Sequence, residues 1–482
     1  MKILVFSMAT IMKDVSMGGS QRHLRELLFH LADQGHQITV LTNRRQDNSE
    51  EYELCPGVQV LPILRFKETF PIPYDTHPFH LAHSYSLIRQ YADTHDVFYI
   101  HDAQMDYGYL HANIPTVASI KNFVYPEAMI SAFHTNRNYL IVSCDYMYSC
   151  IQYTVGRVQP QITDQLRIVK NGVDLSVYKP VEATRKSQLG LTDDDFVLLF
   201  PHRPEASKGI VQAFETVREL KEKLKGPLKG QLKGKARVRL LLPRHFDVHV
   251  SKETEQFYTQ LTQEAKEFQV EESLVFYPWV PGHDMPQLYA IADVTLCIGQ
   301  FIESFGYVQI ESIACGTPVV VSNVGAQRSI VPSGYSVIKV DYGDTESTVE
   351  AIAELASTPM DITGVRQFLD QNYNYKENLL GYEELITSAG KGSSSVFSNT
   401  SLKSGSPMDV SYKLAPWCYV SGPKKGIYHD YFYTYLNQHE LYSFLSTCTE
   451  ESFSQMELVE AGVSSEAIEK AIEDGILVLY TP

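Results

Sequence analysis

The feature that most constrains the fold of this chain is a repeated alternation of short apolar segments with amphipathic helical patterns. Within residues 1–175, the apolar segments ILVF, ITVL, DVFYI, TVASI and LIVS alternate with helical patterns such as HLRELLFHLADQG. Buried strands that alternate with helices are typical of a parallel, doubly wound sheet. The pattern begins again near residue 190 with FVLLF, VRLLL, LVFYP, VTLCI and PVVVS. Two α/β domains are therefore expected, over residues 1–175 and 176–390.

The composition excludes several classes of function. Lys and Arg number 41 against 57 Asp and Glu, which gives a formal net charge of −16. Nucleic acids and anionic membranes bind clustered positive charge, so general affinity for either is not expected. No apolar stretch is long enough to span a membrane, the opening segment MKILVFS is too short for a signal peptide, and the seven cysteines form no CxxC pair. We expect a cytoplasmic protein with reduced thiols and no zinc site.

A basic segment at residues 221–237, KEKLKGPLKGQLKGKAR, departs from this acidic background. A solvated loop is the simpler interpretation, and contact with an anionic acceptor or a lipid head group is the alternative. Peripheral contact with a membrane therefore stays open.

The composition changes again after the second domain. Residues 391–408 are rich in Ser and Gly, which predicts a flexible linker. Residues 409–482 then predict a small α+β module: two strands joined by a turn at 422–426, three helical patterns, and a final strand ILVLY. Ser464 or Ser465 is the expected N-cap of the third helix and Gly475 its terminator.

This order resembles a winged-helix unit and the small peptide-binding domains related to PqqD. The module contains four Lys and no Arg against eleven Asp and Glu, a balance of 4 − 11 = −7, so binding to DNA is not expected. Two interpretations stay open. The module is either a structural appendage or a unit that recruits a peptide or protein by strand addition or groove binding.

Candidate site residues follow the predicted strands, because ligands of such sheets bind at the carboxyl ends of the strands. Neither GxGxxG nor a P-loop motif is present, and the run of three Asp at 193–195 predicts a solvated turn rather than a metal site. Gly18 and Gly19 follow the first strand and lead into a helix, so they could bring backbone N–H groups to an anion. His101 ends the strand DVFYI.

Two further groups lie in the second domain. Arg203 and Lys208 end one strand and begin the next helix, where two cations and a helix N-terminus could hold a diphosphate without a metal. Glu303 and Glu311 lie on either side of a Phe-Gly step. If a helix begins at Tyr307, the two carboxylates reach different parts of one ligand.

In these segments the sequence resembles the GT-B glycosyltransferases, and among them the retaining family 4. The resemblance covers about residues 1–390. It is carried by GGSQRHLRELLFHLADQGHQITVLT, DVFYIHD, KNGVDLSVY, RPEASKG and ESFGYVQIESIACGTPVVVSNVG. It implies two Rossmann-like domains that face a cleft, with the final helix, around residues 373–385, crossing back to the first. It also implies a metal-independent, retaining transfer of a sugar from a nucleotide donor, UDP- or GDP-linked, with no cofactor.

The resemblance also implies a role for each candidate residue. Arg203 and Lys208 would bind the donor diphosphate, and Gly18 and Gly19 would approach it through the backbone. Glu311 would accept hydrogen bonds from the ribose, and Glu303 would bind hydroxyls of the transferred sugar. His101 would contact that sugar near the reacting carbon. The remaining donor contacts are Ser304, Phe305, Gly306, Thr317 and Pro318.

Two departures from the family pattern are visible: His202 stands where glycine is usual, and Ala326 and Ser329 replace a glycine and a glutamate. The acceptor is undetermined and could be a small molecule, a lipid-linked sugar or a peptide. Two alternatives remain, a GT-B sugar-nucleotide epimerase and an inactive sugar- or peptide-binding adaptor.

Overall fold

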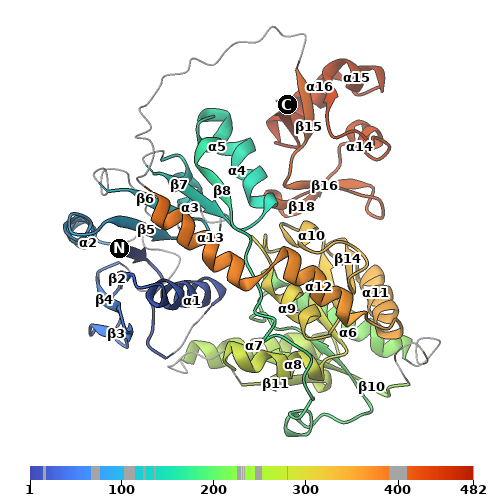
Figure 1. Ribbon diagram of the computed structural model, residues 1–482. Coiled ribbons are helices and arrows are strands. Elements are labelled where there is room, and N and C mark those ends of the chain that lie inside the picture. Colours follow the sequence, from blue (N-terminus) through green and yellow to red (C-terminus); the bar gives the residue numbers. More distant parts are fainter. Residues whose placement is uncertain are drawn as a thin grey trace. The chain divides into compact units, whose positions relative to one another are not determined.

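The computed structural model describes the chain except residues 15–17, 67–75, 103–113, 123–125, 135–136, 225–229, 231, 233, 245–251, 279, 390–409 and 481–482. The predicted linker at 391–408 and much of the basic segment therefore lie outside the described residues. Contacts divide the chain into two units, Met1–Gly172 with Tyr375–Pro407, and Val173–Asn374 with Met408–Pro482. Figure 1 labels the elements of both.

The first unit is built on an eight-stranded sheet with the order β3-β4-β2-β1-β5-β6-β7-β8. All neighbouring strands are parallel except β3 and β4. The strands are β1 (Lys2–Ser7), β2 (Gln37–Asn43), β3 (Tyr52–Cys55), β4 (Val58–Leu64), β5 (Val97–His101), β6 (Thr116–Ser119), β7 (Tyr139–Val142) and β8 (Leu166–Ile168). The helices are α1 (Gly19–Asp33), α2 (Pro78–Ala92), α3 (Pro126–Ala132), α4 (Asp145–Val158), α5 (Ile162–Gln165) and α13 (Tyr375–Ser388).

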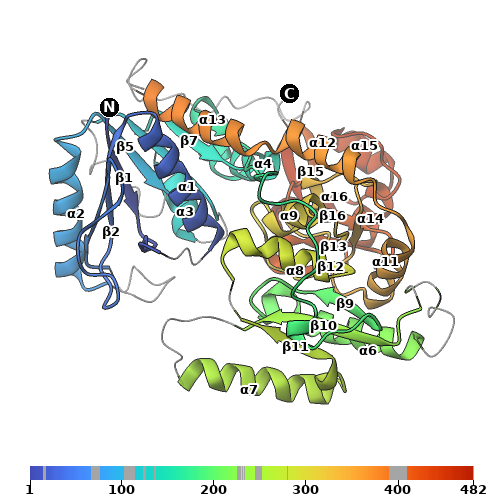
Figure 2. The ribbon, with the colours of Figure 1, turned by 60° about the horizontal axis from the view of Figure 1, so that its bottom comes forward.

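Helix α13 belongs to this first unit although it follows the second sheet in the chain. It lies beside α1 and near β5 and β6 (Figures 1 and 2). Its buried face includes Leu379, Tyr382 and Ile386, which join the core formed by β1, β2, β5 and α1. The aliphatic face of the helix and the polar contacts described below therefore fix it on the first sheet.

The second unit contains a six-stranded parallel sheet with the order β11-β10-β9-β12-β13-β14. Its strands are β9 (Asp195–Leu199), β10 (Arg237–Pro243), β11 (Leu274–Tyr277), β12 (Val294–Cys297), β13 (Val319–Ser322) and β14 (Val337–Val340). The helices are η3 (Ser187–Leu189), η4 (Ala206–Lys208), α6 (Ile210–Lys223), α7 (Lys252–Glu267), η6 (Glu271–Ser273), η7 (Gly282–Asp284), α8 (Met285–Ile291), α9 (Tyr307–Ala314), α10 (Gln327–Ile330), α11 (Thr345–Ser357) and α12 (Ile362–Asn372). Two parallel sheets with helices confirm the predicted α/β fold.

The C-terminal segment of the second unit, which we call the C-terminal module (residues 410–480), forms two small antiparallel sheets, β19-β15-β20 and β16-β17-β18. Its elements are β15 (Ser411–Leu414), β16 (Cys418–Ser421), β17 (Gly426–His429), η8 (Asp430–Phe432), β18 (Thr434–Leu436), α14 (His439–Leu445), β19 (Phe453–Ser454), α15 (Gln455–Glu460), α16 (Ser465–Glu473) and β20 (Leu477–Tyr480). The side chain of Ser464 caps α16, and Gly475 follows the helix with φ +68°. The winged-helix interpretation stays a prediction.

The prediction of two strands at the start of the module was too simple. The first predicted strand is divided into β15 and β16 by a turn in which Cys418 N donates to Ala415 O. The two halves then join different sheets, β15 with β20 and β16 with β17. Among the described residues, no helix has the length and apolar character needed to cross a membrane.

Candidate active site

The predicted site residues fall into two groups, one in each unit. In the second unit, Lys208 and Glu303 form a close ion pair in which Nζ of Lys208 donates to Oε1 of Glu303 at 2.6 Å. Their side chains are only 20% and 21% exposed. Nζ of Lys208 also lies 3.5 Å from the centroid of the Phe301 ring. The pair places one cation and one carboxylate at the carboxyl ends of β9 and β12.

A backbone contact that the sequence did not reveal holds Lys208 in place. Gly209 has φ +95°, and a Cβ there would lie 2.7 Å from N of Gly299. A Cβ on Gly299 would lie 2.3 Å from C of Lys208. Only glycine at both positions permits this approach between the loop after β9 and the loop after β12. The N–H of Phe301 then donates to Ser207 O at 2.8 Å.

The charges around this pair are mutually stabilising. Burial alone would raise the pKa of Glu303, but the charge of Lys208, its hydrogen bond and nearby His202 hold that pKa below its ordinary value. Burial, with the charge of Lys208, lowers the pKa of His202 to about 4, so this imidazole is neutral at neutral pH. Nε2 of His202 lies 3.4 Å from Sγ of Cys297. His202, which stands where the family usually has glycine, is thus a neutral hydrogen-bonding group beside the ion pair.

Arg203 is placed differently from Lys208. Its side chain is 58% exposed, and Nη1 lies 4.0 Å from Oε1 of Glu205. An exposed pair at this distance contributes little stability, so the guanidinium remains able to exchange Glu205 for another anion.

Glu303 is followed by the segment that begins α9. Gly306 is the N-cap of α9 with φ +86°, a conformation that favours glycine. Ser304 and Phe305 are buried, and the Phe305 ring packs against Tyr307 and Tyr373 at 5.2 and 5.5 Å. Any ligand contact from Phe305 must therefore come from its backbone.

Glu311 lies within α9 and is also buried. The hydroxyl of Tyr289 donates to its Oε2 at 3.0 Å, which orients the carboxylate. In the same helix the side chain of Gln309 is 1% exposed, and neither its Nε2 nor its Oε1 has a partner among the described residues. An unpaired buried amide is costly, so Gln309 is an added candidate for contact with a ligand or a water molecule. The sequence offered no pattern that singled it out.

Thr317 and Pro318 are not brought together with the other donor residues. They follow the far end of α9 and precede β13, whereas Glu303 follows the carboxyl end of the parallel neighbour β12. The hydroxyl of Thr317 donates to Tyr289 O at 2.6 Å, and its N–H donates to Ser312 O at 3.0 Å. We therefore withdraw both residues from the predicted phosphate site, because this end of β13 is opposite to the one where the charged residues gather.

In the first unit, His101 ends β5 and is buried. Its Nε2 lies 2.9 Å from Oγ and 3.0 Å from O of Ser20, and its Nδ1 lies 2.9 Å from the Tyr99 hydroxyl. Burial and the charge of Lys121 lower the pKa of His101 well below its ordinary value. A neutral imidazole is thus tied to the first turn of α1.

Gly18 and Gly19 stand at the start of that same helix. Gly18 is its N-cap in an extended conformation, and a Cβ there would meet no described atom within 4 Å. Open space at this position leaves the first N–H groups of a 15-residue helix accessible to an anion.

Next to His101, Asp102 and Lys121 form a polar cluster that the sequence did not predict. Asp102 has φ +69°, and its Oδ1 accepts hydrogen bonds from the N–H groups of Lys121 and Asn122 at 2.9 and 3.2 Å. Nζ of Lys121 donates to the Tyr382 hydroxyl of α13 at 2.6 Å. Burial raises the pKa of Asp102 to about 6 and lowers that of Lys121 to about 7. The proton balance of this cluster therefore changes near neutral pH.

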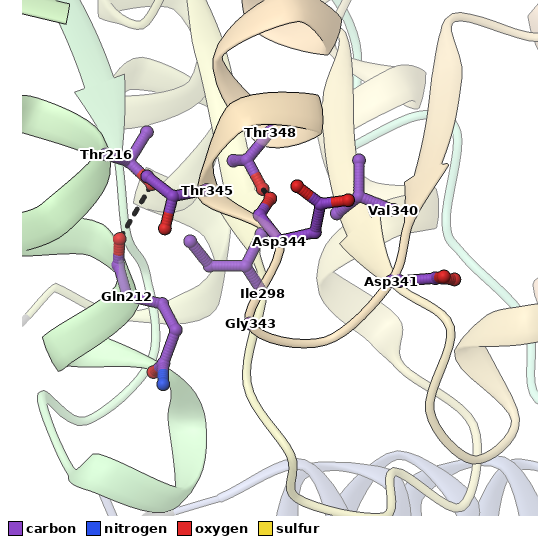
Figure 3. A pocket seen from close by; sticks show the side chains of 9 residues that line it. All are labelled: Gln212, Thr216, Ile298, Val340, Asp341, Gly343, Asp344, Thr345 and Thr348. Carbon is purple, nitrogen blue, oxygen red and sulfur yellow. Dashed lines mark hydrogen bonds between the residues drawn. The ribbon is translucent and has the colours of Figure 1, made fainter. Parts of the chain in front are cut away.

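A pocket of about 210 Å³ lies in the second unit, and its lining includes neither Lys208 nor Glu303 (Figure 3). It lies between α6 and the start of α11, and its lining includes Gln212, Ile298 and Asp344. Ligand pockets usually measure at least about 300 Å³, so it is too small for a nucleotide sugar. Among the described residues, no group of three or more His, Cys, Asp or Glu side chains is placed to hold a metal ion.

Two consecutive parallel α/β sheets, with charged residues after the carboxyl ends of their strands, are the organisation of GT-B glycosyltransferases. Residues 17–177 match the model of the family described as Glycosyltransferase Family 4, and residues 181–372 match that of Glycosyl transferases group 1. The two matches are consecutive and together cover most of the chain, which therefore belongs to the group 1 and family 4 glycosyltransferases. The chain is a glycosyltransferase.

Individual proteins support the assignment. A D-inositol 3-phosphate glycosyltransferase from Acidothermus cellulolyticus is 27% identical over 363 residues, 70% of this chain and 78% of that protein. Sucrose-phosphate synthase from Thermosynechococcus elongatus is similar in structure, with a TM-score of 0.64 and 18% identity over 81% of this chain and 100% of that one. HepE from Anabaena, solved in complex with UDP and glucose, has a TM-score of 0.58 at 18% identity over 80% of this chain and 100% of that one. The two structural likenesses concern the fold.

Proposed function

We propose that the chain transfers a sugar from a nucleoside-diphosphate donor to an acceptor hydroxyl, without a metal and with retention of the anomeric configuration. The observation that carries this proposal is the Lys208–Glu303 pair at the carboxyl ends of β9 and β12. A desolvated ammonium group beside a helix N-terminus suits a departing diphosphate, and the adjacent carboxylate suits sugar hydroxyls.

In the proposed step, the bond between the anomeric carbon and the β-phosphate oxygen breaks, and its electron pair stays on the phosphate. The acceptor oxygen forms the new bond on the same face of the sugar, and its proton passes to the departing phosphate. Lys208 and the exposed Arg203 would stabilise the charge that develops on the diphosphate. Retention follows from the family resemblance.

Glu311 is proposed to bind the ribose. The Tyr289 hydroxyl orients this carboxylate, and carboxylate oxygens are good acceptors for the hydroxyl groups of a ribose. The amide of Gln309, two residues before Glu311 in α9, has no partner among the described residues and is proposed as a further donor contact.

His101 is proposed to contact the transferred sugar. Both of its ring nitrogens already have partners, so a ligand must replace the Ser20 contact at Nε2. The Tyr99 hydroxyl would meanwhile keep the ring oriented through Nδ1.

The donor base and the acceptor are less constrained. The structural neighbour solved with UDP and glucose suggests a UDP-linked donor as the first to test, with GDP-linked donors next. The acceptor of the relative from A. cellulolyticus is, by its name, D-inositol 3-phosphate. For this chain a small molecule, a lipid-linked sugar or a peptide remains a candidate, and we propose a cytoplasmic location.

The test is a thermal-shift panel of nucleoside diphosphates and nucleotide sugars, followed by release of nucleoside diphosphate in the presence of a chelator. We expect one donor to stabilise the protein and to be turned over with the chelator present. An epimerase would convert the sugar nucleotide and release little diphosphate with any acceptor. A binding adaptor would be stabilised by the donor without turnover, and either result would overturn the proposal.

A further inference from the structure

The loop after β13, residues 323–330, touches the candidate donor site through its central residues. The N–H of Ala326 donates to Glu303 O at 2.9 Å. Gly325 has φ +60°, and a Cβ there would lie 2.9 Å from Glu303 O, so this backbone lies directly against Glu303. A Cβ on Gly306 would lie 3.2 Å from Cγ of Gln327. The loop therefore supports both the ion-paired glutamate and the N-cap of α9.

The C-terminal module holds one end of this loop. Both terminal nitrogens of Arg328 donate hydrogen bonds to the module. Nη2 donates to Oδ1 and Oδ2 of Asp430, at 2.7 Å each. Nη1 donates to the backbone oxygens of Pro416 and Cys418, at 3.2 and 3.1 Å. The Asp430 side chain is 0% exposed and that of Arg328 18% exposed. Its guanidinium also lies 5.1 Å from the centroid of the Tyr419 ring. These charge-assisted contacts of the two terminal nitrogens fix the direction of the Arg328 side chain as well as its distance from Asp430.

The module also holds the other end of the loop. The hydroxyl of Ser421 donates to Oδ2 of Asp341, and Nδ2 of Asn323 donates to Oδ1 of the same carboxylate at 3.1 Å. The N–H of Asn323 donates to Val340 O at 2.8 Å. Asp341 thus links the module to the first residue of the loop. Nearby, the Tyr435 hydroxyl donates to Tyr342 O at 3.1 Å.

We propose that the C-terminal module is a positioning element of the donor site, in which Asp430 and Ser421 hold the loop 323–330 at its two ends so that its centre fixes Glu303 and Gly306. Arg328 and Asp430 are positioning residues, because they touch Glu303 only through the loop. The kinetic consequence rests on the proposed function, whereas the structural coupling does not. The module then contributes to catalysis whether or not it also recruits a partner.

The structural coupling is tested by hydrogen–deuterium exchange in the full-length chain. Asp430→Asn removes the charge at nearly constant volume. We expect faster exchange both at Ala326 and in residues 301–306. Faster exchange limited to the module and to residues 328–330, with residues 301–306 and Ala326 at the wild-type rate, would overturn the proposal. This readout needs no donor, so it decides the proposal even if no transfer activity is found.

The kinetic consequence is tested on the same variant. We expect Asp430→Asn to lower kcat/KM for the donor at least tenfold while leaving the acceptor KM unchanged, since a misplaced catalytic group costs rate without removing a binding contact. Asp430→Glu keeps the charge and should recover most of this loss.

Glu440→Gln is the matched control. Oε2 of Glu440 accepts hydrogen bonds from N and Oγ of Ser464 inside the module. It should lower the stability of the module without changing donor kcat/KM. Equal kinetic losses in Asp430→Asn and Glu440→Gln would show that only module folding matters and would overturn the positioning role.

Discussion

Removal of Lys208 is the sharpest perturbation of the candidate active site. Lys208→Met keeps the length and apolar stem of the side chain but leaves the Glu303 carboxylate without the cation that lies 2.6 Å away. Breaking a buried ion pair from one side costs about 3–5 kcal/mol. The two side chains are about one-fifth exposed, so we expect the lower end of that range.

About 3 kcal/mol corresponds to a factor of about 10² in rate if it is lost from the transition state. Lys208→Met should therefore lower kcat about 10²- to 10³-fold, as removal of one preorganised contact does elsewhere. Glu303→Gln should lower it less. The double variant should be only slightly worse than Lys208→Met alone, because residues that act as a unit have non-additive effects.

Release of nucleoside diphosphate from the donor measures all four proteins of this cycle. Multiplicative effects of the two substitutions would refute the idea that the pair acts as a unit, and wild-type kcat in Lys208→Met would refute the role of Lys208. The pH dependence gives a second check. Because the pKa of Glu303 is held below its ordinary value of 4.5, the stability it contributes is present above pH 4.5 and is lost as the pH falls further. Lys208→Met should lack this loss.

Three further outcomes are expected. Glu311→Gln should raise the donor KM about tenfold or more, as expected for loss of a hydrogen bond to a charged group. Tyr289→Phe should raise this KM less in the same steady-state assay. The reverse order would contradict ribose binding by Glu311. Gly299→Ala should reduce turnover nearly as much as Lys208→Met, because the added Cβ would lie 2.3 Å from C of Lys208 and must displace that backbone. Circular dichroism should show that the variant is folded. Normal turnover would contradict the contact between Gly299 and Lys208. The lowered pKa of Lys121, about 7, means that the unfolded chain binds more protons above pH 7. Urea denaturation should show stability rising from pH 7 to 9 in the wild type and rising less in Lys121→Met. Equal slopes would count against the lowered pKa of Lys121.

The sequence predicted the two sheets from their central strands, because those strands are uniformly apolar. It predicted the edge strand β11, but it missed β3, β4 and β8 in the first sheet and β14 in the second. The edge strand β14 has two half-exposed residues, Ile338 and Lys339, between its buried ends, and β4 contains Pro62. Such strands lack the continuous apolar character that identifies a strand buried on both faces.

The candidate site was predicted in part. Lys208 and Glu303 could be selected as candidates because they follow strands, and Glu311 because it lies in the helix after Glu303, all within segments that resemble the family. The Gly209–Gly299 contact and the Arg328–Asp430 pair join residues far apart in the chain, and no local pattern reports such pairs. Thr317 was assigned to the donor group through the family resemblance, but it precedes β13, whereas Glu303 follows the carboxyl end of the neighbouring parallel strand β12. The eight residues of α9 lie between Glu303 at one edge of the sheet and Thr317 at the other.

Binding of the nucleoside diphosphate tests the central claim most directly. Isothermal titration calorimetry with UDP and with GDP, in the presence of a chelator, would compare the wild type with Arg203→Ala and Lys208→Ala. Our account predicts that the wild type binds one of the two ligands without a metal and that each variant binds it at least tenfold more weakly. Equal affinity in all three proteins, or binding that requires a divalent metal, would contradict it.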